Sequence, residues 1–333
     1  MKTRFCAFLL LIALLVSLAS CGYQFEGTGA FSDPSSKTVT FCSGNGGTDT
    51  VLTIPAGERV STPAAPSKSG YVFLGWYTDE ACTTPYDFSR AVTKDLTLWA
   101  GYLPDYVHWT NLLTASFVPA TVCVHASAKT GGFFSTETSS KLGSGVIFRR
   151  DGNTYYLLTN HHVVAFPELS SPTVSYVIED YRGTTYEGAT LIASDPSYDL
   201  AVLSFRGGTG DNALPAAALA ASDVPAGEEI AALGHPAGQK NALTFGETLG
   251  YREAQTAESE SESNVTFPVL YHTAPISSGS SGGAVVNAAL EVVALNYAGI
   301  YEEEGGALKY SLAIPVTQIR EFLAAAGVAV SAD

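Results

Sequence analysis

Short runs in which apolar and polar residues alternate begin after the N-terminal segment. They are separated by turns such as the one from Gly44 to Gly47, and they cover 38–41, 51–54, 71–74 and 96–100. A period of two, with β-branched and aromatic side chains, is typical of strands that bury one face. The pattern predicts a small β-rich unit over residues 38–103.

The same short runs continue through residues 106–330, where turns are frequent and no long helical period occurs until the end. This region is predicted to be an all-β barrel or sandwich. The exception is 315–327, where Ile319, Phe322 and Leu323 have helical spacing and Gly327 stands at the position of a C-cap. A terminal helix that packs on the barrels is expected there.

The chain starts with a basic residue pair and an apolar run from Phe5 to Val16. This run is too short to cross a bilayer, which takes about 20 apolar residues, so residues 1–20 are predicted to be a secretory signal. Leu-Ala-Ser-Cys at its end resembles the bacterial lipobox, which implies a lipidated Cys21. An ordinary signal peptide that happens to stop at a cysteine is the alternative. Residues 21–37, rich in Gly, Ser and Pro, are expected to form a flexible tether.

The 333 residues carry 17 Lys+Arg and 32 Asp+Glu, a formal charge of −15. Such an acidic chain repels phosphate backbones and anionic lipid headgroups, so a nucleic-acid partner is not expected. Membrane attachment through Cys21 would be hydrophobic instead. The length suggests about two domains.

Besides Cys6 in the signal and Cys21 at its end, three cysteines remain. Export permits disulfides, and Cys42 and Cys82 could form one, but an odd number prevents complete pairing. Cys123 lies in a strand-like run, where a single cysteine is usually a small buried apolar side chain. Because the sequence has no CxxC and no Cys/His cluster, we expect no metal and no cofactor.

Three segments could together support nucleophilic catalysis. The pair His161-His162 follows an apolar run that starts at Leu157, and Asp199 directly precedes another apolar run. Ser281 lies in the glycine-rich segment 277–283. A serine hydroxyl is a weak nucleophile near neutral pH. It needs a base within about 3 Å, a carboxylate that orients the base, and donors for the developing oxyanion.

The motifs Thr-Asn-x-His-Val-Val, Asp-Leu-Ala-Val-Leu and Gly-x-Ser-Gly-Gly, in this order, resemble the trypsin-like (chymotrypsin-fold) serine proteases, and most closely their HtrA-type branch. The segment Gly143-Ser144-Gly145 supports the resemblance. It implies a two-barrel fold in which His162 is the general base, Asp199 orients it and Ser281 is the nucleophile. Backbone N–H groups of Gly279 and Ser281 would form the oxyanion hole.

Some positions depart from the family. Ser280 replaces the usual Asn or Asp before the nucleophile, so the activation switch of digestive enzymes is not expected, and Thr273 replaces an upstream Asp. The short remainder after the terminal helix is expected to hold no PDZ domain. By the resemblance, the primary specificity pocket is lined by residues that carry no acidic group at its base, which favours small or aliphatic substrate side chains: Pro275, Ile276, Asn296, Tyr297 and Ala298.

The N-terminal unit, with Gly-Tyr-Val-Phe-Leu-Gly-Trp-Tyr at 70–77, resembles the internalin B-type repeat, a β-grasp-like module of bacterial surface proteins. Its aromatic residues could form a recognition surface for a cell-wall or surface ligand, but a role as the core of a tiny domain is favoured. The acidic stretches 253–262 and 302–304 are expected to be solvated loops, with a calcium site or an acidic lip as alternatives.

These observations together predict a lipid-anchored serine endopeptidase on the outer face of a bacterial membrane, acting on polypeptides. The alternative is a catalytically inactive or latent surface protein that binds through its N-terminal module. The three motif residues of the catalytic pattern are all present, which favours the enzyme.

Overall fold

The computed structural model describes residues 35–131, 136–236, 239–254, 264–302 and 306–330. The predicted signal, Cys21 and most of the tether lie outside these residues, as do 255–262 and 303–304 of the acidic stretches. Two compact units divide the chain after Asp105. Within the described ranges, no helix has both the length and the apolar character needed to cross a membrane.

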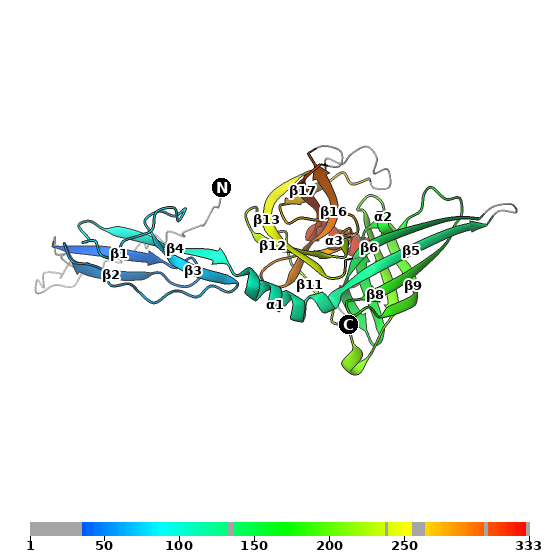
Figure 1. The fold of residues 1–333 in the computed structure, drawn as a ribbon, viewed down its shortest axis with the longest axis horizontal. Coiled ribbons are helices and arrows are strands. Elements are labelled where there is room, and N and C mark those ends of the chain that lie inside the picture. The colour runs from blue at the N-terminus through cyan, green and yellow to red at the C-terminus, as the bar shows by residue number, and fades with distance from the viewer. Residues whose placement is uncertain (1–34, 132–135, 237–238, 255–263, 303–305, 331–333) are drawn as a thin grey trace, which may run out of the picture. The chain divides into compact units, whose positions relative to one another are not determined.

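The N-terminal unit is a mixed sheet of four strands in the order β2-β1-β4-β3. Strands β1 and β4 pair in parallel at its centre, where Val39 faces Leu96, and the outer strands pair antiparallel. This arrangement is the expected β-grasp-like module (Figure 1). The strand bounds are β1 Ser36–Cys42, β2 Thr50–Pro55, β3 Tyr71–Tyr77 and β4 Leu96–Pro104.

The aromatic side chains of this unit form its core. Trp76 is buried and lies edge-on to Phe41 at 4.8 Å between ring centroids, and Phe73 packs on Trp76 at 5.6 Å. The core role therefore holds for Trp76. The structure has Cys42 and Cys82 as thiols, and the bridge considered between them is not formed in it.

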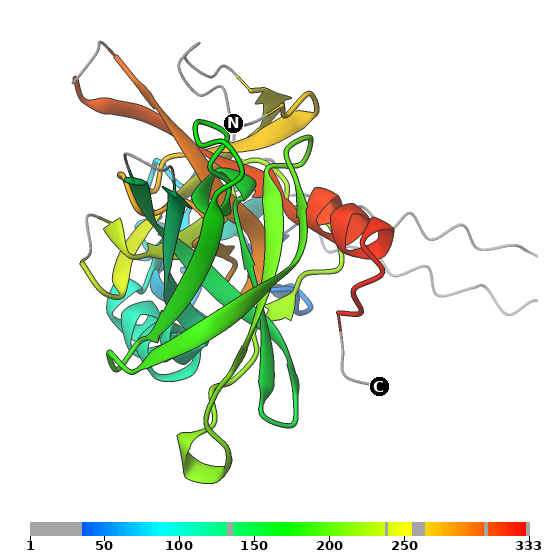
Figure 2. The ribbon, with the colours of Figure 1, turned by 90° about the vertical axis from the view of Figure 1, so that its right-hand side faces the viewer.

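The first barrel of the C-terminal unit closes in the order β10-β7-β6-β5-β8-β9. Alternate residues of β5, such as Val122 and Val124, fill its interior, and the residues between them face outward. Figure 2 shows this barrel from its side. Its strand bounds are β5 Thr121–Gly131, β6 Thr136–Asp151, β7 Thr154–Thr159, β8 Thr173–Asp180, β9 Thr185–Asp195 and β10 Leu200–Arg206.

The second barrel is a ring of strands that the β16–β17 pairing closes, with the short β11 added in parallel beside β16. The two-barrel prediction is therefore confirmed. Strand bounds here are β11 Ala218–Leu219, β12 Glu229–Gly234, β13 Ala242–Glu253, β14 Pro268–His272, β15 Ala284–Val286, β16 Glu291–Tyr301 and β17 Leu308–Pro315.

Helix α3 (Val316–Ala325) follows β17 and packs on β16 and β17. Ile319, Phe322 and Leu323 are buried, Pro315 occupies the N-cap, and Gly327 has the positive φ of 67° that favours glycine. The predicted terminal helix is confirmed. The described connections include the 3₁₀ turns η1 (Val118–Ala120) and η2 (Gly210–Asn212) and the short helix α2 (His161–Val164).

Helix α1 (Tyr106–Ser116) contradicts the prediction that no helix precedes α3. Its buried side chains are Trp109 and Leu113, one helical turn apart, and its other residues are mostly β-branched, aromatic or polar. A single buried pair is too weak a periodic signal to outweigh residues that favour strands.

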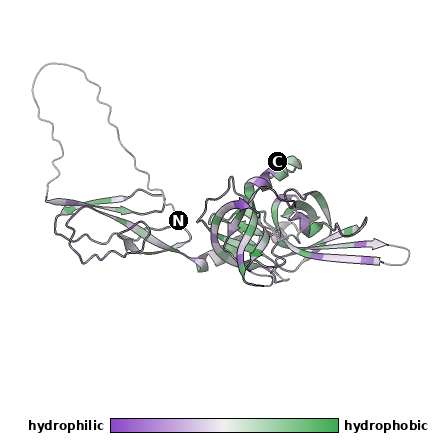
Figure 3. Ribbon diagram, turned by 90° about the horizontal axis from the view of Figure 1, so that it is seen from above, coloured by the Kyte–Doolittle hydropathy of each residue, from purple (hydrophilic) through white to green (hydrophobic). Residues whose placement is uncertain are grey.

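The hydropathy of the residues differs between the barrel strands and the parts of strands that extend beyond them (Figure 3). Apolar residues concentrate in the strands that enclose the cores, whereas the part of β5 and β6 that extends beyond the first barrel carries more hydrophilic residues.

Candidate active site

His162 lies in α2, directly after β7. The turn is fixed by two buried side chains that precede it. Thr159 donates its hydroxyl to the carbonyl of Ser144 at 2.7 Å, and the Asn160 amide donates to the carbonyl of Asp199 at 2.9 Å. The His162 side chain keeps 28% exposure, so a rigid turn presents it to solvent on one side.

Asp199 is fully buried and holds His162 by two hydrogen bonds. The backbone N–H of His162 donates to Oδ1 at 2.9 Å, and the ring Nδ1 lies 2.7 Å from Oδ2. A carboxylate only accepts, so Nδ1 carries the proton and Nε2 of the neutral ring is left to accept one. Asp199 has a φ of 50°, a left-handed conformation that Asp adopts more readily than most residues.

Ser281 lies in the loop between β14 and β15, and this loop packs against the segment that carries His162. Its carbonyl accepts from the N–H of Ser144 at 2.7 Å, and a Cβ built on Gly143 would lie 3.2 Å from the same carbonyl and 2.6 Å from Val163. The hydroxyl of Ser281 donates to the carbonyl of Tyr297 at a long 3.4 Å. Gly143 thus brings the nucleophile candidate and the His162 turn against one strand.

The two glycines after Ser281 are required by close backbone approach. Gly282 has a φ of 83°, and a Cβ there would meet the Ser144 carbonyl at 2.2 Å; at Gly283 it would meet the Leu233 carbonyl at 2.1 Å. Any side chain at either position would push the loop off the strands that hold it.

Gly279 is anchored by a hydroxyl that sequence reasoning did not single out. Ser144, buried in β6, donates its Oγ to the Gly279 carbonyl at 2.7 Å and accepts the N–H of His235 at 2.8 Å. Gly279 itself has a φ of 93°, and the next residue, Ser280, donates its N–H to the Ser277 carbonyl at 2.9 Å. A side chain of the first barrel therefore fixes a loop of the second.

A cavity of about 560 Å³ lies beside this loop. Pro275, Ile276 and Asn296 of the expected pocket line it, whereas Tyr297 and Ala298 are buried in β16 and are not among its lining residues. Lys240 is the only charged side chain in the described part of the lining. The remaining lining residues are Ala232, Leu233, Gly234, Pro236, Gln239, Ala242, Leu243, Thr244, Ser277 and Ser280.

Three other titratable side chains, those of His272, His235 and Cys123, are buried. Burial lowers the pKa of His272 to about 4, against a smaller opposing effect of Asn296 and Ala274, and it lowers the pKa of His235 to about 4 as well. Burial also raises the pKa of the Cys123 thiol to about 12, and the Glu179 carboxylate adds to this shift. Neutral thiols are poor nucleophiles, so Cys123 is not a rival for Ser281.

Comparison with known proteins gives two domain matches. Residues 143–295 match the family described as trypsin-like peptidase domain, a range that contains His162, Asp199 and Ser281. Residues 38–101 match the Listeria-Bacteroides repeat domain. The repeat is thus present in the N-terminal unit.

Among curated relatives, the chain is 34% identical over 193 residues to the "Serine protease Do-like HtrB" of Bacillus subtilis, a match that covers 57% of this chain and 39% of that protein. It is 33% identical over 180 residues to the "Probable periplasmic serine endoprotease DegP-like" of Pseudomonas fluorescens, covering 54% and 33%. The chain thus spans about a third to two-fifths of the length of these relatives.

Among solved structures, the Rv3671c protease of M. tuberculosis in its active form superimposes with a TM-score of 0.52 and 19% identity, covering 69% of this chain and 90% of that one. Its inactive form gives a TM-score of 0.51 with 20% identity, covering 68% and 98%. The similarity shows a shared fold, and the C-terminal unit has the chymotrypsin-like architecture that the motifs implied.

Proposed function

We propose that the chain is a serine endopeptidase that hydrolyses peptide bonds through Ser281, His162 and Asp199. The observation that carries this proposal is the buried Asp199 carboxylate bonded to Nδ1 of His162 at 2.7 Å, beside a loop in which two glycines follow Ser281. The trypsin-like match over residues 143–295 and the relatives named as serine proteases support it.

In the proposed reaction, Nε2 of His162 takes the proton of the Ser281 hydroxyl as Oγ attacks the scissile carbonyl. The ring proton stays on Nδ1, hydrogen-bonded to Asp199, and the carboxylate stabilises the imidazolium. His162 then protonates the leaving amine, and water hydrolyses the acyl-enzyme by the same route. The hydroxyl must first exchange its long bond to the Tyr297 carbonyl for one to His162.

The oxyanion would be stabilised by the backbone N–H groups of Gly279 and Ser281. One such donor contributes about 2.7–4 kcal/mol in related chemistry, provided that it is held in place before the reaction. Ser144 supplies that restraint on Gly279, because its hydroxyl fixes the Gly279 carbonyl inside the protein. Ser144 is therefore a positioning residue for the hole.

Polypeptides are the proposed substrates. Half of the described residues that line the cavity beside the loop are Ala, Leu, Pro or Ile and none is acidic, which favours a small or aliphatic residue before the cleaved bond. Pro275, Ile276 and Asn296 are the expected residues that contribute to this lining.

Export and attachment through a lipidated Cys21 belong to the same proposal. The basic and apolar N-terminal run with its lipobox-like end supports them, and one relative is named as periplasmic. The N-terminal unit, proposed as an internalin B-type repeat, would hold or recruit the enzyme at the cell surface.

A binding role for that unit has one specific observation in its favour. Val72, Leu74 and Leu103 are 47%, 54% and 55% exposed, and Val72 faces Leu103 across β3 and β4. Adjacent exposed apolar side chains on a sheet mark a contact surface. This role is compatible with catalysis by the other unit, and it would remain if the enzyme were latent.

A fluorophosphonate active-site probe with intact-mass detection tests the activity. We expect one adduct on the wild-type chain and none on Ser281→Ala, because the probe reacts only with an activated serine. Ser278→Ala, which removes an exposed hydroxyl three residues away, is the matched control and should label as the wild type does. Labelling of Ser281→Ala, or none of the wild type, would contradict the assignment.

A further inference from the structure

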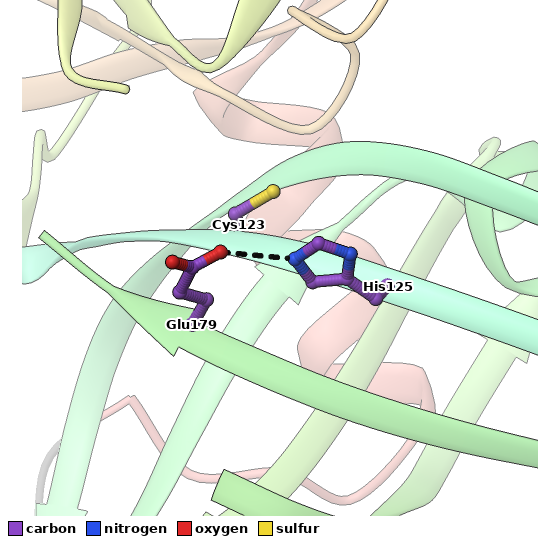
Figure 4. Close-up of side chains that lie close together, drawn as sticks. All are labelled: Cys123, His125 and Glu179. Atoms are coloured by element: carbon purple, nitrogen blue, oxygen red, sulfur yellow. Dashed lines mark hydrogen bonds and ion pairs between the residues drawn. The ribbon is translucent and has the colours of Figure 1, made fainter. Parts of the chain in front are cut away.

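Cys123, His125 and Glu179 form a second cluster of chemically active side chains, outside the proposed catalytic site (Figure 4). Cys123 and His125 are two residues apart on β5 and so share its outward face, and Glu179 on β8 is the direct Cα partner of Cys123. His125 Nε2 lies 3.2 Å from Glu179 Oε2. Cys123 and His125 are close in the sequence, but Glu179 joins them only through the pairing of β5 with β8, and no such cluster was expected from the sequence.

The donor set suits a transition-metal ion. One sulfur, one imidazole nitrogen and one carboxylate oxygen all lie within 4.8 Å of one another. Tetrahedral zinc with usual bond lengths places such atoms about 3.4–3.6 Å apart. The cluster is therefore within about 1 Å of a ligand geometry, on two paired strands of a closed barrel.

We propose that Cys123, His125 and Glu179 bind a divalent zinc-type cation, with a fourth position open to water. The thiolate and carboxylate balance the double charge, and the half-exposed His125, with 42% side-chain exposure, gives the ion a path from solvent. On binding, the thiol of Cys123 releases its proton to solvent and its sulfur bonds to the metal, without any change of oxidation state.

Lys240 competes for this site. Its ammonium group is paired with Oε1 of Glu179, while Oε2 of the same carboxylate faces His125, so a metal that draws on the charge of this carboxylate weakens the ion pair to the lysine. Lys240 also lines the cavity beside Ser277 and Ser280. Metal binding would thus remove a restraint from a wall of the proposed substrate cavity, which makes the site regulatory rather than catalytic.

Cobalt(II) titration of the purified full chain, under reducing conditions, tests the proposal without relying on activity. We expect a sulfur-to-cobalt charge-transfer band in the near ultraviolet that saturates at one equivalent and disappears when zinc is added. Cys123→Ser should lose the band. His125→Ala, at a half-exposed position that tolerates change, should weaken binding by at least about tenfold.

Two further variants sharpen the result. Lys240→Ala should bind cobalt more tightly than the wild type, because Glu179 loses its competing cation. Cys82→Ser, which removes a thiol of the N-terminal unit, should leave the titration unchanged. No charge-transfer band in the wild type, the same band in Cys123→Ser, or unchanged affinity in both His125→Ala and Lys240→Ala would overturn the proposal.

Discussion

Replacing Ser144 with alanine tests whether one hydroxyl organises the proposed oxyanion hole. The change removes a buried Oγ that donates to the Gly279 carbonyl at 2.7 Å and accepts from the His235 N–H at 2.8 Å. It leaves the His162–Asp199 pair in place, because neither residue bonds to that hydroxyl. The expected effect is therefore on the geometry of the Gly279 segment alone.

The expected loss of unfolding free energy follows from the two backbone groups that lose their partner, the Gly279 carbonyl and the His235 N–H. An unsatisfied buried donor or acceptor costs about 1–3 kcal/mol, so two of them should lower the free energy of unfolding by roughly 2–6 kcal/mol. A domain in the middle of the typical range of about 5–15 kcal/mol stays folded. Complete loss of an oxyanion donor lowers kcat by about 10²–10³, so partial misalignment of Gly279 should lower it about tenfold to a hundredfold.

The assay compares kcat and KM on a peptide substrate with urea unfolding of the same preparations. Thr121→Val is the matched control, because it removes a buried hydroxyl that donates to the Val118 carbonyl at 2.8 Å, away from the loop. We expect both variants to lose stability and only Ser144→Ala to lose kcat, with KM little changed.

A Ser144→Ala enzyme with the kcat of the control would refute the reasoning. The hydroxyl would then be a structural bond like any other, and the loop around Gly279 would hold its shape without it. Loss of activity that tracks stability in both variants would have the same meaning.

Two other predictions concern buried groups. Asp199→Asn should lower kcat about 10⁴-fold with KM little changed, because an amide at this position favours the wrong tautomer of His162; a loss below tenfold would contradict the orienting role. His272, whose pKa of about 4 in the folded chain lies below the ordinary 6.5, stays neutral while the unfolded chain gains a proton. This difference contributes up to about 3 kcal/mol to the free energy of unfolding above pH 6.5, and the contribution is lost as the pH falls toward 4. The free energy of unfolding of His272→Gln, measured with urea, should therefore fall less between pH 6.5 and pH 4 than that of the wild type.

Local patterns predicted most of the fold. Alternation identified the strands of the N-terminal unit, and the spacing of Ile319 and Phe322 identified α3, because each signal resides within one element. Helix α1 was missed since its burial rests on Trp109 and Leu113 alone. The match to motifs anticipated the two barrels, which the periodicity by itself left as barrel or sandwich.

The candidate site could be predicted where its residues lie in short sequence motifs, as around His162, Asp199 and Ser281. Contacts that join distant segments were not: Ser144 reaches Gly279 across 135 positions of sequence. The Cys123 cluster depends in the same way on the register of β5 with β8. The expected pocket residue Tyr297 shows a related limit, since neighbouring residues on a strand point to opposite faces. For Ala298 the register shift between Asn296 and Ala298 breaks this alternation.

The hydrogen bond from Ser144 to Gly279 joins two barrels, each of which carries part of the proposed active site. His162, Asp199 and Ser144 belong to segments of the first barrel, whereas Gly279 and Ser281 belong to the second. The connection between the barrels runs through the exposed turn η2. A chain cut at that turn would give one fragment with the acid–base pair and another with the nucleophile, so hydrolysis would report their reassociation, as in a split-enzyme sensor.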